Sequence, residues 1–269
     1  ILEGHFRGVF NRVSTYDREV LTLLEQRPTE ENIGRVPSLE EVKSIICGAK
    51  NNKAAGLSGT FIELYKAGME DEEVCSRVHE AIAEVWRSGS IPEHWKEGKL
   101  KEIGKGGGKD LSNPSNYRGI MLLDVVSKAI SALINRRLQE LLAKHGRESQ
   151  NGFTDGRGCR DSSFALRLAL QTLREQGGTA WVAFIDLVKA FDSVDREAMC
   201  DVLLRYGAPE SLVRVIRAVH EKVIVVLKSG GAEVKFDSTL GVIQGAAASP
   251  TLFLFMIAAW LETADWKGD

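Results

Sequence analysis

The sequence has few of the residues that build disulfide or zinc sites, and they are not spaced for either. Four cysteines and five histidines are scattered over 269 residues, with no C-x-x-C pair. Neither a disulfide framework nor a zinc site is expected, and reduced thiols are typical of intracellular proteins. No apolar run approaches the roughly 18 residues of a membrane span, and no signal-peptide pattern is present. We therefore expect a protein of the nucleus or cytoplasm, with no membrane partner. Because the chain begins with Ile1, we also expect it to belong to a longer polypeptide.

The chain also lacks a strong overall charge, since its formal net charge is −2. The distribution is less even: residues 91–160 hold 13 Lys and Arg against 8 Asp and Glu, and all other residues hold 22 against 29. Basic charge gathered in one block can form a local phosphate-binding surface. On charge alone, a solvated loop region explains this block equally well.

Local patterns predict an α/β fold without an internal repeat or an obvious linker. Two short strands are expected around the Gly- and Lys-rich loop of 99–123, a hairpin is expected at "KSGGAEV", and a strand is expected at 180–186. Ser38 and Glu41 form a predicted capping box at the start of one helix. Apolar spacing and stop signals predict further helices at 71–89, 124–144, 161–176, 193–206, 209–221 and 251–263.

The predicted strand at 180–186 ends in Asp186, within "WVAFIDLVKAFDSVDR". A carboxylate at the end of a buried strand needs a hydrogen-bond network, an ion pair or a metal ion. Asp192 and Ser193 are better placed to cap the helix expected from about Val194, which leaves Asp186 for another role. A structural role and a metal-binding role both remain open at this point.

Two other stretches admit a packing and a ligand-binding interpretation. In "GVIQGAAASP", Gln244 and Gly245 precede small residues that allow close approach of the backbone to a neighbouring helix or to a ligand. In "NPSNYRGIMLL", Arg118 follows a Lys-rich loop and opens a strand. A guanidinium at that place either holds phosphates through paired hydrogen bonds or is an ordinary surface arginine.

Taken in order, five stretches resemble the reverse transcriptase domain of non-LTR (LINE-type) retrotransposons. They are "NNKAAGLSGTFIELYKAG", "IPEHWKEGKLKEIGKGGGK" with "NYRGIMLL", "QNGFTDGRGCRD", "FIDLVKAFDSVDR" and "GVIQGAAASPTLF". The fourth is similar to palm motif A of that family and the fifth to its motif B. Thr154 and Ile243 stand where the family usually has arginine.

The resemblance implies a role for each candidate residue. Asp186 would be a catalytic, metal-binding carboxylate, and Phe191 would lie under the sugar of the incoming nucleotide and exclude a 2′-hydroxyl. The remaining nucleotide-binding residues would be Lys101, Lys105, Arg118, Gln244 and Gly245. The implied cofactor is a pair of Mg²⁺ ions that support nucleotidyl transfer. The implied partners are an RNA template, a DNA primer and a deoxynucleoside triphosphate.

The implied fold is that of right-hand polymerase fingers with a partial palm, in which a small antiparallel sheet is backed by helices. We expect an N-terminal helical extension and the start of the fingers at 1–90, fingers with the basic loop at 91–178, and a partial palm at 179–269. The motifs stop before the aromatic-x-Asp-Asp turn of the family's motif C, and Asp265 and Asp269 are poor substitutes for it. An alternative is therefore a non-catalytic, domesticated remnant that binds nucleic acid or a protein.

Overall fold

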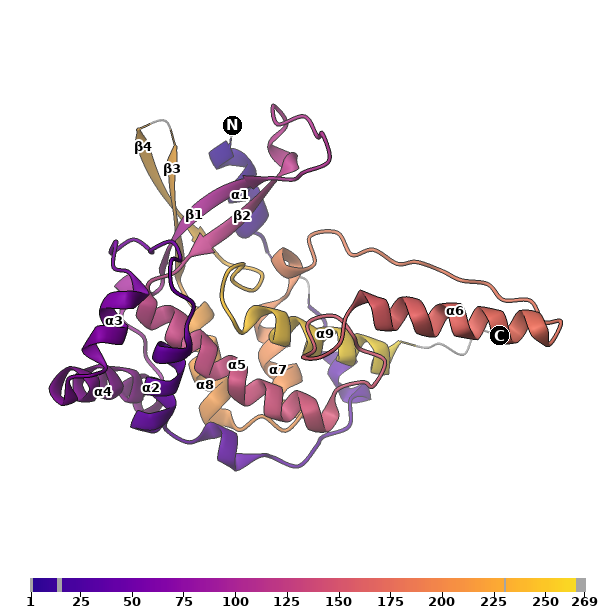
Figure 1. The fold of residues 1–269 in the computed structure, drawn as a ribbon, viewed down its shortest axis with the longest axis horizontal. Helices are drawn as coiled ribbons and strands as arrows, with labels where there is room; N and C mark the ends of the chain where they lie inside the picture. The colour runs from indigo at the N-terminus through magenta and orange to yellow at the C-terminus, as the bar shows by residue number, and fades with distance from the viewer. Residues whose placement is uncertain (1, 14–15, 230, 265–269) are drawn as a thin grey trace.

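In the computed structural model, which describes residues 2–13, 16–229 and 231–264, a four-stranded sheet stands on a layer of helices (Figure 1). The strand order is β2-β1-β3-β4. The strands are β1 (Glu97–Gly104), β2 (Tyr117–Leu122), β3 (Val223–Ser229) and β4 (Ala232–Ser238). Both predicted hairpins are confirmed, because β1 pairs with β2 and β3 pairs with β4, each antiparallel.

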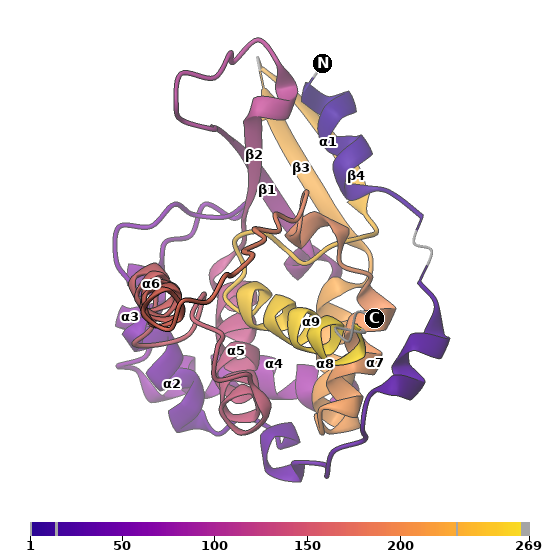
Figure 2. The ribbon, with the colours of Figure 1, turned by 90° about the vertical axis from the view of Figure 1, so that its right-hand side faces the viewer.

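The sheet as a whole is mixed, which corrects the antiparallel sheet that we expected. The two hairpins join through β1 and β3, which run parallel, with Glu97 opposite Ile224 and Leu100 opposite Leu227. Parallel neighbours require a long connection, and here that connection includes β2 and the helices between residues 125 and 220. Helix α1 (Leu2–Phe10) covers one face of the sheet and buries Phe6, Val9 and Phe10. Figure 2 shows α1 lying along β4.

The helical layer follows the predicted pattern. Helix α2 (Leu39–Gly48) begins with the expected capping box, in which Ser38 Oγ accepts from the Glu41 backbone and the Glu41 carboxylate accepts from the Ser38 backbone. Helix α4 (Glu72–Ser88) is capped by Asp71 and ends at Gly89, whose φ is +66°. The other helices of this layer are α3 (Ile62–Gly68), α5 (Val125–His145), α7 (Arg196–Arg205), α8 (Glu210–His220) and α9 (Ser249–Thr263).

One helix start differs from its prediction. Helix α7 begins at Arg196, and its cap is Asp195, whose side chain accepts from Ala198 N at 2.7 Å. Asp192 and Ser193 instead lie in the short 3₁₀ turn η5 (Phe191–Ser193) before it. A side chain caps only the helix that starts directly after it. Because α7 starts two residues later than expected, Asp195 caps it in place of Asp192.

An N-terminal segment runs along the helical layer and joins elements distant in sequence. It contains the 3₁₀ turns η1 (Arg18–Leu23) and η2 (Glu31–Gly34). Arg27 N donates to Arg205 O at 2.9 Å, and the Arg27 guanidinium forms an ion pair with Glu262 of α9. The same guanidinium stacks on the Tyr206 ring, 3.7 Å from its centroid. This segment is therefore packed against the helical layer.

The strand expected at 180–186 is not formed. Residues 178–187 are irregular and exposed, and Trp181 and Phe184 expose 97% and 86% of their surface. A strand needs a neighbour for its backbone hydrogen bonds, and the described part of the chain provides none here. Helix α6 (Cys159–Glu175) buries no residue and projects from the body (Figure 1). The surface area of 15658 Å² exceeds by about a third the roughly 11,600 Å² typical of a folded monomer of this mass.

Candidate functional site

The hairpin of β1 and β2 has one covered face and one open face. Leu100, Gly119 and Met121 lie on the face that packs against Phe6 of α1. Because side chains alternate along a strand, Lys101 and Arg118 lie on the opposite face, and both are exposed. Lys101 pairs with Ile120 and Arg118 pairs with Ile103, so the two cations are neighbours in the register. This open face fits the phosphate-binding role predicted for them.

Lys105 has a more restricted position. It follows β1, is half-buried, and its Nζ donates to Ser115 O at 2.8 Å, which ties it to the far side of the hairpin loop. Its charge lies close enough to the carboxyl of Asp192 to favour the ionised form of that group. Lys105 therefore belongs to the same surface, although one of its three donors already has a partner.

The predicted loop with Gln244 and Gly245 is bonded directly to β2. Met121 N donates to Gln244 O at 2.7 Å. Gly245 has a φ of +114°, and a Cβ added there would lie 2.4 Å from Met121 O. Any larger residue would clash with the β2 backbone, so glycine is required by close approach of two chain segments. Gly245 packs against the strand that also carries Arg118. A packing role for this glycine and a position beside a bound ligand are therefore compatible.

The same loop is bonded to the turn that follows Asp186. Val242 N donates to Phe191 O at 2.9 Å, and Gly241 N donates to Val194 O at 2.8 Å. The side chains also meet: Gln244 Nε2 donates to Asp192 Oδ1 at 2.5 Å. The structure thus brings Phe191, Gln244, Gly245 and the strand of Arg118 together from three separate parts of the sequence.

Asp192 is a buried carboxyl with an exposed fraction of 8%. Its burial raises the pKa, against the opposing effects of the Gln244 hydrogen bond and the charges of Lys189, Arg12 and Lys105. The Asp192 carboxyl accepts from the side chain of Gln244, so the amide nitrogen of Gln244 faces Asp192. The sequence indicated only a helix-cap role for Asp192, because the partner in this contact lies 52 residues further along the chain.

We call the meeting point of the Phe191 turn, the Gln244 loop and β2 the junction. Phe191 lies in an aromatic cluster at this junction. Its ring stacks on Phe253 of α9 at 5.0 Å between centroids, and Phe153 meets it edge-on at 5.9 Å. Phe153 comes from the "QNGFTDGRGCRD" loop, where the Thr154 hydroxyl donates to Gln150 O. Three of the recognised motifs therefore share one apolar contact, which fixes the position of the Phe191 ring.

A half-buried arginine, Arg196, holds the residues that lead into the Gln244 loop. The Arg196 guanidinium donates to Gly241 O at 2.9 Å, His220 O at 2.6 Å and Ser238 O, and it also reaches Ser238 Oγ and Leu240 O. Burial lowers the pKa of Arg196 to about 10, so the group is charged at neutral pH. No sequence signal marked this residue, because its acceptors are backbone carbonyls from residues 220–241.

Arg12 adds a link from the N-terminal segment to both sides of the junction. Its Nη2 donates to Asp192 O at 2.9 Å, and its backbone N donates to Thr239 Oγ1 at 3.2 Å. Phe10 O accepts from Thr239 N at 2.9 Å. The first helix and the residues after it thus contribute to the candidate site, which the predicted role of 1–90 as an extension did not include.

Asp186 is separate from this junction. It lies in the exposed segment 178–187, and among residues 2–13, 16–229 and 231–264 no three His, Cys, Asp or Glu side chains gather closely enough to hold a metal ion. Mg²⁺ prefers several oxygen ligands in fixed geometry, and one exposed carboxylate does not meet that requirement. Asp265 and Asp269 lie outside the described residues. The described residues therefore do not fit a pair of magnesium ions by themselves.

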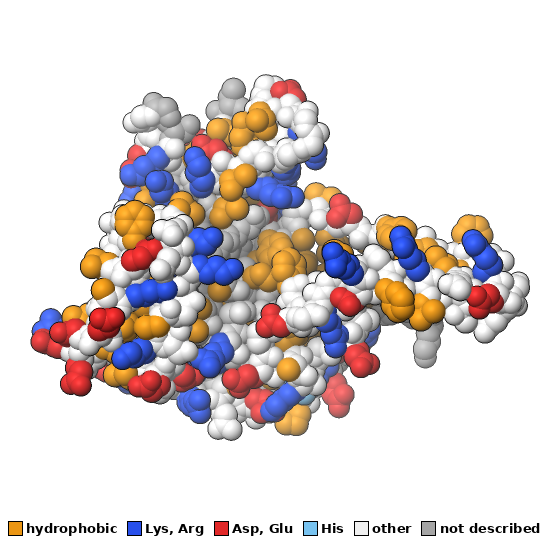
Figure 3. Space-filling view, viewed as in Figure 1, with side chains coloured by type: hydrophobic (Ala, Val, Ile, Leu, Met, Phe, Trp, Pro, Cys, Tyr) orange, Lys and Arg blue, Asp and Glu red, His pale blue; other side chains and the backbone are white. Residues whose placement is uncertain are grey.

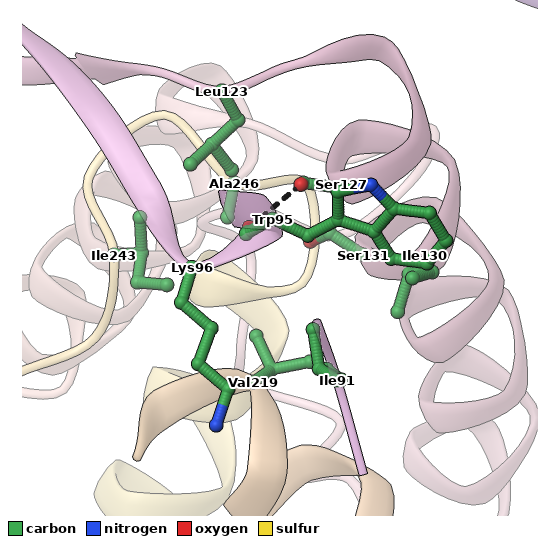
Figure 4. Close-up of a pocket in the computed structure, with 10 residues that line it drawn as sticks. All are labelled: Ile91, Trp95, Lys96, Leu123, Ser127, Ile130, Ser131, Val219, Ile243 and Ala246. Carbon is green, nitrogen blue, oxygen red and sulfur yellow. Dashed lines mark hydrogen bonds between the residues drawn. The ribbon is translucent and has the colours of Figure 1, made fainter. Parts of the chain in front are cut away.

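Ile243, at a position where the resemblance led us to note a missing arginine, is part of the core. With Ala246 it lines a small apolar cavity of about 20 Å³ between the residues before β1, helix α5 and the Gln244 loop (Figure 4). Ser127 Oγ donates to Trp95 O across its wall at 2.8 Å. The cavity has room for about one water molecule, so it is a packing feature. The apolar surroundings explain why isoleucine suits this position.

Figure 3 shows the face of the molecule that carries the candidate site. Lysine and arginine side chains border a hollow below β1 and β2, and hydrophobic side chains line its floor. The loop before α3 lies to the left of the hollow (Figure 1), and there Lys128 Nζ donates to Ala54 O and Asp124 accepts from Ser58. A basic rim over an apolar floor suits a ligand with phosphates and flat rings.

The chain matches the family model of the reverse transcriptase (RNA-dependent DNA polymerase) over residues 103–266, which is more than half of its length. The chain belongs to the reverse transcriptase family. The match includes β2 with Arg118, the turn with Phe191 and the loop with Gln244, so the junction described above lies inside the family domain.

Several curated relatives come from non-LTR retrotransposable elements. A 115 kDa protein of the type-1 element R1DM of Drosophila melanogaster is 28% identical over 234 residues, which are 84% of this chain and 22% of that protein. A Pol polyprotein of an R2 element of Popillia japonica is 30% identical over 61% of this chain and 23% of its own length. That of R2DM from Drosophila melanogaster is 29% identical, over 56% and 14%. The chain thus spans less than a quarter of these relatives and represents a reverse transcriptase domain of the non-LTR type.

One further finding concerns the membrane. None of the described helices of this reverse transcriptase domain is both long enough and apolar enough to cross a lipid bilayer.

Proposed function

We propose that this chain forms the fingers and part of the palm of an RNA-directed DNA polymerase that binds an RNA template, a DNA primer and a deoxynucleoside triphosphate. The observation that carries the proposal is the junction of three segments, in which Gln244 contacts Asp192 while its backbone pairs with β2. The basic open face of the β1–β2 hairpin adjoins that junction, so phosphates have a binding surface beside it.

In this proposal each residue has a defined task. Lys101, Lys105 and Arg118 bind the triphosphate, Gln244 and Gly245 border the nucleotide and template, and the Phe191 ring excludes a 2′-hydroxyl. The ring is suited to that task because Phe253 and Phe153 hold it on two sides. A side chain that cannot move away gives a firm steric limit.

Asp186 is assigned as one ligand of the two magnesium ions that the whole enzyme uses. Among the described residues no three His, Cys, Asp or Glu side chains gather closely enough to hold a metal ion, so we derive no chemical step from this chain alone. The proposed domain division follows: an extension and the start of the fingers at 1–90, fingers at 91–178, and a partial palm at 179–269. The extension also contacts the palm through Arg12.

Primer extension on an RNA template tests the proposal. We expect no extension by this chain alone, and extension by a protein in which the chain is followed by the corresponding C-terminal part of an active relative. In that longer protein Asp186→Asn should abolish synthesis, whereas Phe191→Ala should preserve it and increase ribonucleotide incorporation.

Two results would contradict the proposal. Extension by this chain alone, lost on Asp186→Asn, would show that the second carboxylate is already present. A correctly folded but inactive longer protein would favour the remnant that binds nucleic acid without catalysis.

A further inference from the structure

Helix α6 carries a row of arginines on one side. Arg160, Arg167 and Arg174 are seven residues apart, which is close to two helical turns, so their side chains leave the helix in nearly the same direction. All three are exposed. In Figure 3 the basic side chains of α6 lie on the same face of the molecule as the basic rim of the hollow.

The charge of this row is not neutralised by its surroundings. None of the three guanidinium groups donates to, or pairs with, any residue that the structure describes. The two acidic residues of α6 have other partners: Asp161 accepts from Gly158 N at 2.7 Å, and Glu175 accepts from Gln171. Three unpaired arginines on a helix that buries nothing are available to an external anion.

An exposed aromatic ring lies within the row. Phe164 is 69% exposed, and it lies four residues after Arg160 and three before Arg167, the spacings that bring side chains together on a helix. These three residues line one surface pocket with Cys159 and Ser163. A ring between two guanidinium groups offers a stacking surface for a base and donors for the phosphates on either side.

We propose that this face of α6 binds a single strand of nucleic acid, with a base on Phe164 and the backbone along Arg160, Arg167 and Arg174. The row is about 21 Å long, which matches the axial length of about six nucleotides of one strand. The inference rests on the proposed function, because it extends the substrate surface of that domain beyond the hollow. A lipid surface fits less well, since guanidinium groups lie on both sides of the aromatic ring along the helix.

Binding of a fluorescein-labelled oligouridylate to the chain, followed by anisotropy from about 50 to 200 mM salt, tests this surface. Replacing all three arginines by glutamine should weaken binding at low salt. It should also reduce the slope of log affinity against log salt by about 2, since each lost phosphate contact contributes about 0.7. Phe164→Ala should weaken binding by about 5- to 100-fold without changing the slope, because it removes stacking and no charge.

A matched variant controls for net charge. Arg18→Gln, Arg77→Gln and Arg214→Gln together remove the same charge from three other exposed positions, and this variant should keep the original slope. Circular dichroism should show all variants folded, because α6 buries no residue. A Phe164→Trp variant keeps the stacking surface and should bind like the original chain.

The outcomes separate this inference from the proposed function. If the α6 variant binds RNA with unchanged affinity and slope, while neutralising Lys101, Lys105 and Lys109 flattens the salt dependence, the α6 surface is refuted and the hollow stands. If the original chain binds no RNA at low salt, both proposals fail. Binding to phosphatidylserine vesicles that requires the α6 arginines, with RNA binding unaffected by them, would overturn the inference in favour of a membrane surface.

Discussion

Replacing Arg196 by methionine should be among the most destabilising single changes in this domain. The substitution keeps a long unbranched side chain with similar helix propensity, so it removes the guanidinium with little change in shape. Four backbone carbonyls, of His220, Ser238, Leu240 and Gly241, then lose a donor. Each buried acceptor without a partner costs about 1–3 kcal/mol.

The net cost is smaller than the sum of these contacts. Removing the cation also ends the penalty for keeping a charge away from water, and the groove lined by Arg196, His220 and Ser238 admits water to some of the carbonyls. We therefore expect the free energy of unfolding to fall by about 3–5 kcal/mol, as when one partner of a buried charge contact is removed. Lysine has three donors in place of five, so Arg196→Lys should lose about half as much.

Urea unfolding followed by circular dichroism measures the change. A loss of this size should move the midpoint by about 1–2 M, given the slope expected for a domain of this size. Arg217→Met is the matched control, because Arg217 is more exposed and has one weak contact, at 3.4 Å, with Glu197. It should cost less than about 1 kcal/mol. If Arg196→Met costs no more than Arg217→Met, Arg196 does not hold the Gln244 loop and our reasoning is wrong.

Three further outcomes are expected. Asp186→Asn should change the free energy of unfolding by less than about 0.5 kcal/mol, because Asp186 is exposed; a clear loss in urea unfolding would support a structural role. Neutralising Lys101, Lys105 and Lys109 together should flatten the salt dependence of RNA binding, with a slope lower by about 2 in anisotropy titrations; an unchanged slope would remove the basis for the phosphate-binding face. Burial, with the nearby charge of Arg196, lowers the pKa of His220 from 6.5 to about 4. The unfolded chain therefore takes up the proton first, and this group's contribution, present above pH 6.5, is lost as the pH falls towards 4, by up to about 3 kcal/mol. His220→Gln should show a shallower loss than the original chain over that range, whereas His94→Gln, at an exposed position, should not.

The parts of the fold that the sequence predicted are those controlled by neighbouring residues. The capping box of Ser38 and Glu41 involves a separation of three residues, and the two hairpins depend on glycine-containing turns between adjacent strands. Such signals are local, so a single sequence contains them in full. The strand predicted at 180–186 was wrong because its signal was also only local. The composition of this segment favours a strand, but a strand also depends on a neighbouring strand elsewhere in the chain.

The residues of the candidate site were also only partly indicated by the sequence. Motif order predicted a common site for Arg118, Phe191, Gln244 and Gly245. The structure brings their segments together, and their roles in binding a nucleotide stay a prediction. Motif order did not indicate Asp192, Arg12 or Arg196. The contacts described above join these residues to partners 24 to 227 residues away. The folded path of the backbone decides which groups meet, and the residue type alone does not reveal it. Whether Asp186 joins the group stays a prediction.

The packing of the N-terminal segment has a consequence for the order of events during synthesis. Arg27 leaves the ribosome long before its partner Glu262, which lies 235 residues later. At about 5–20 residues per second, translation needs on the order of 10–50 s to supply that partner. The turn η1, with Leu21, lacks its contacts with α9 until the end of this interval, and the turn η2, with Ile33, lacks its contacts with α8 until residues 210–220 are made. They are thus natural targets for chaperones that protect nascent chains, and a slowed ribosome would lengthen their exposure.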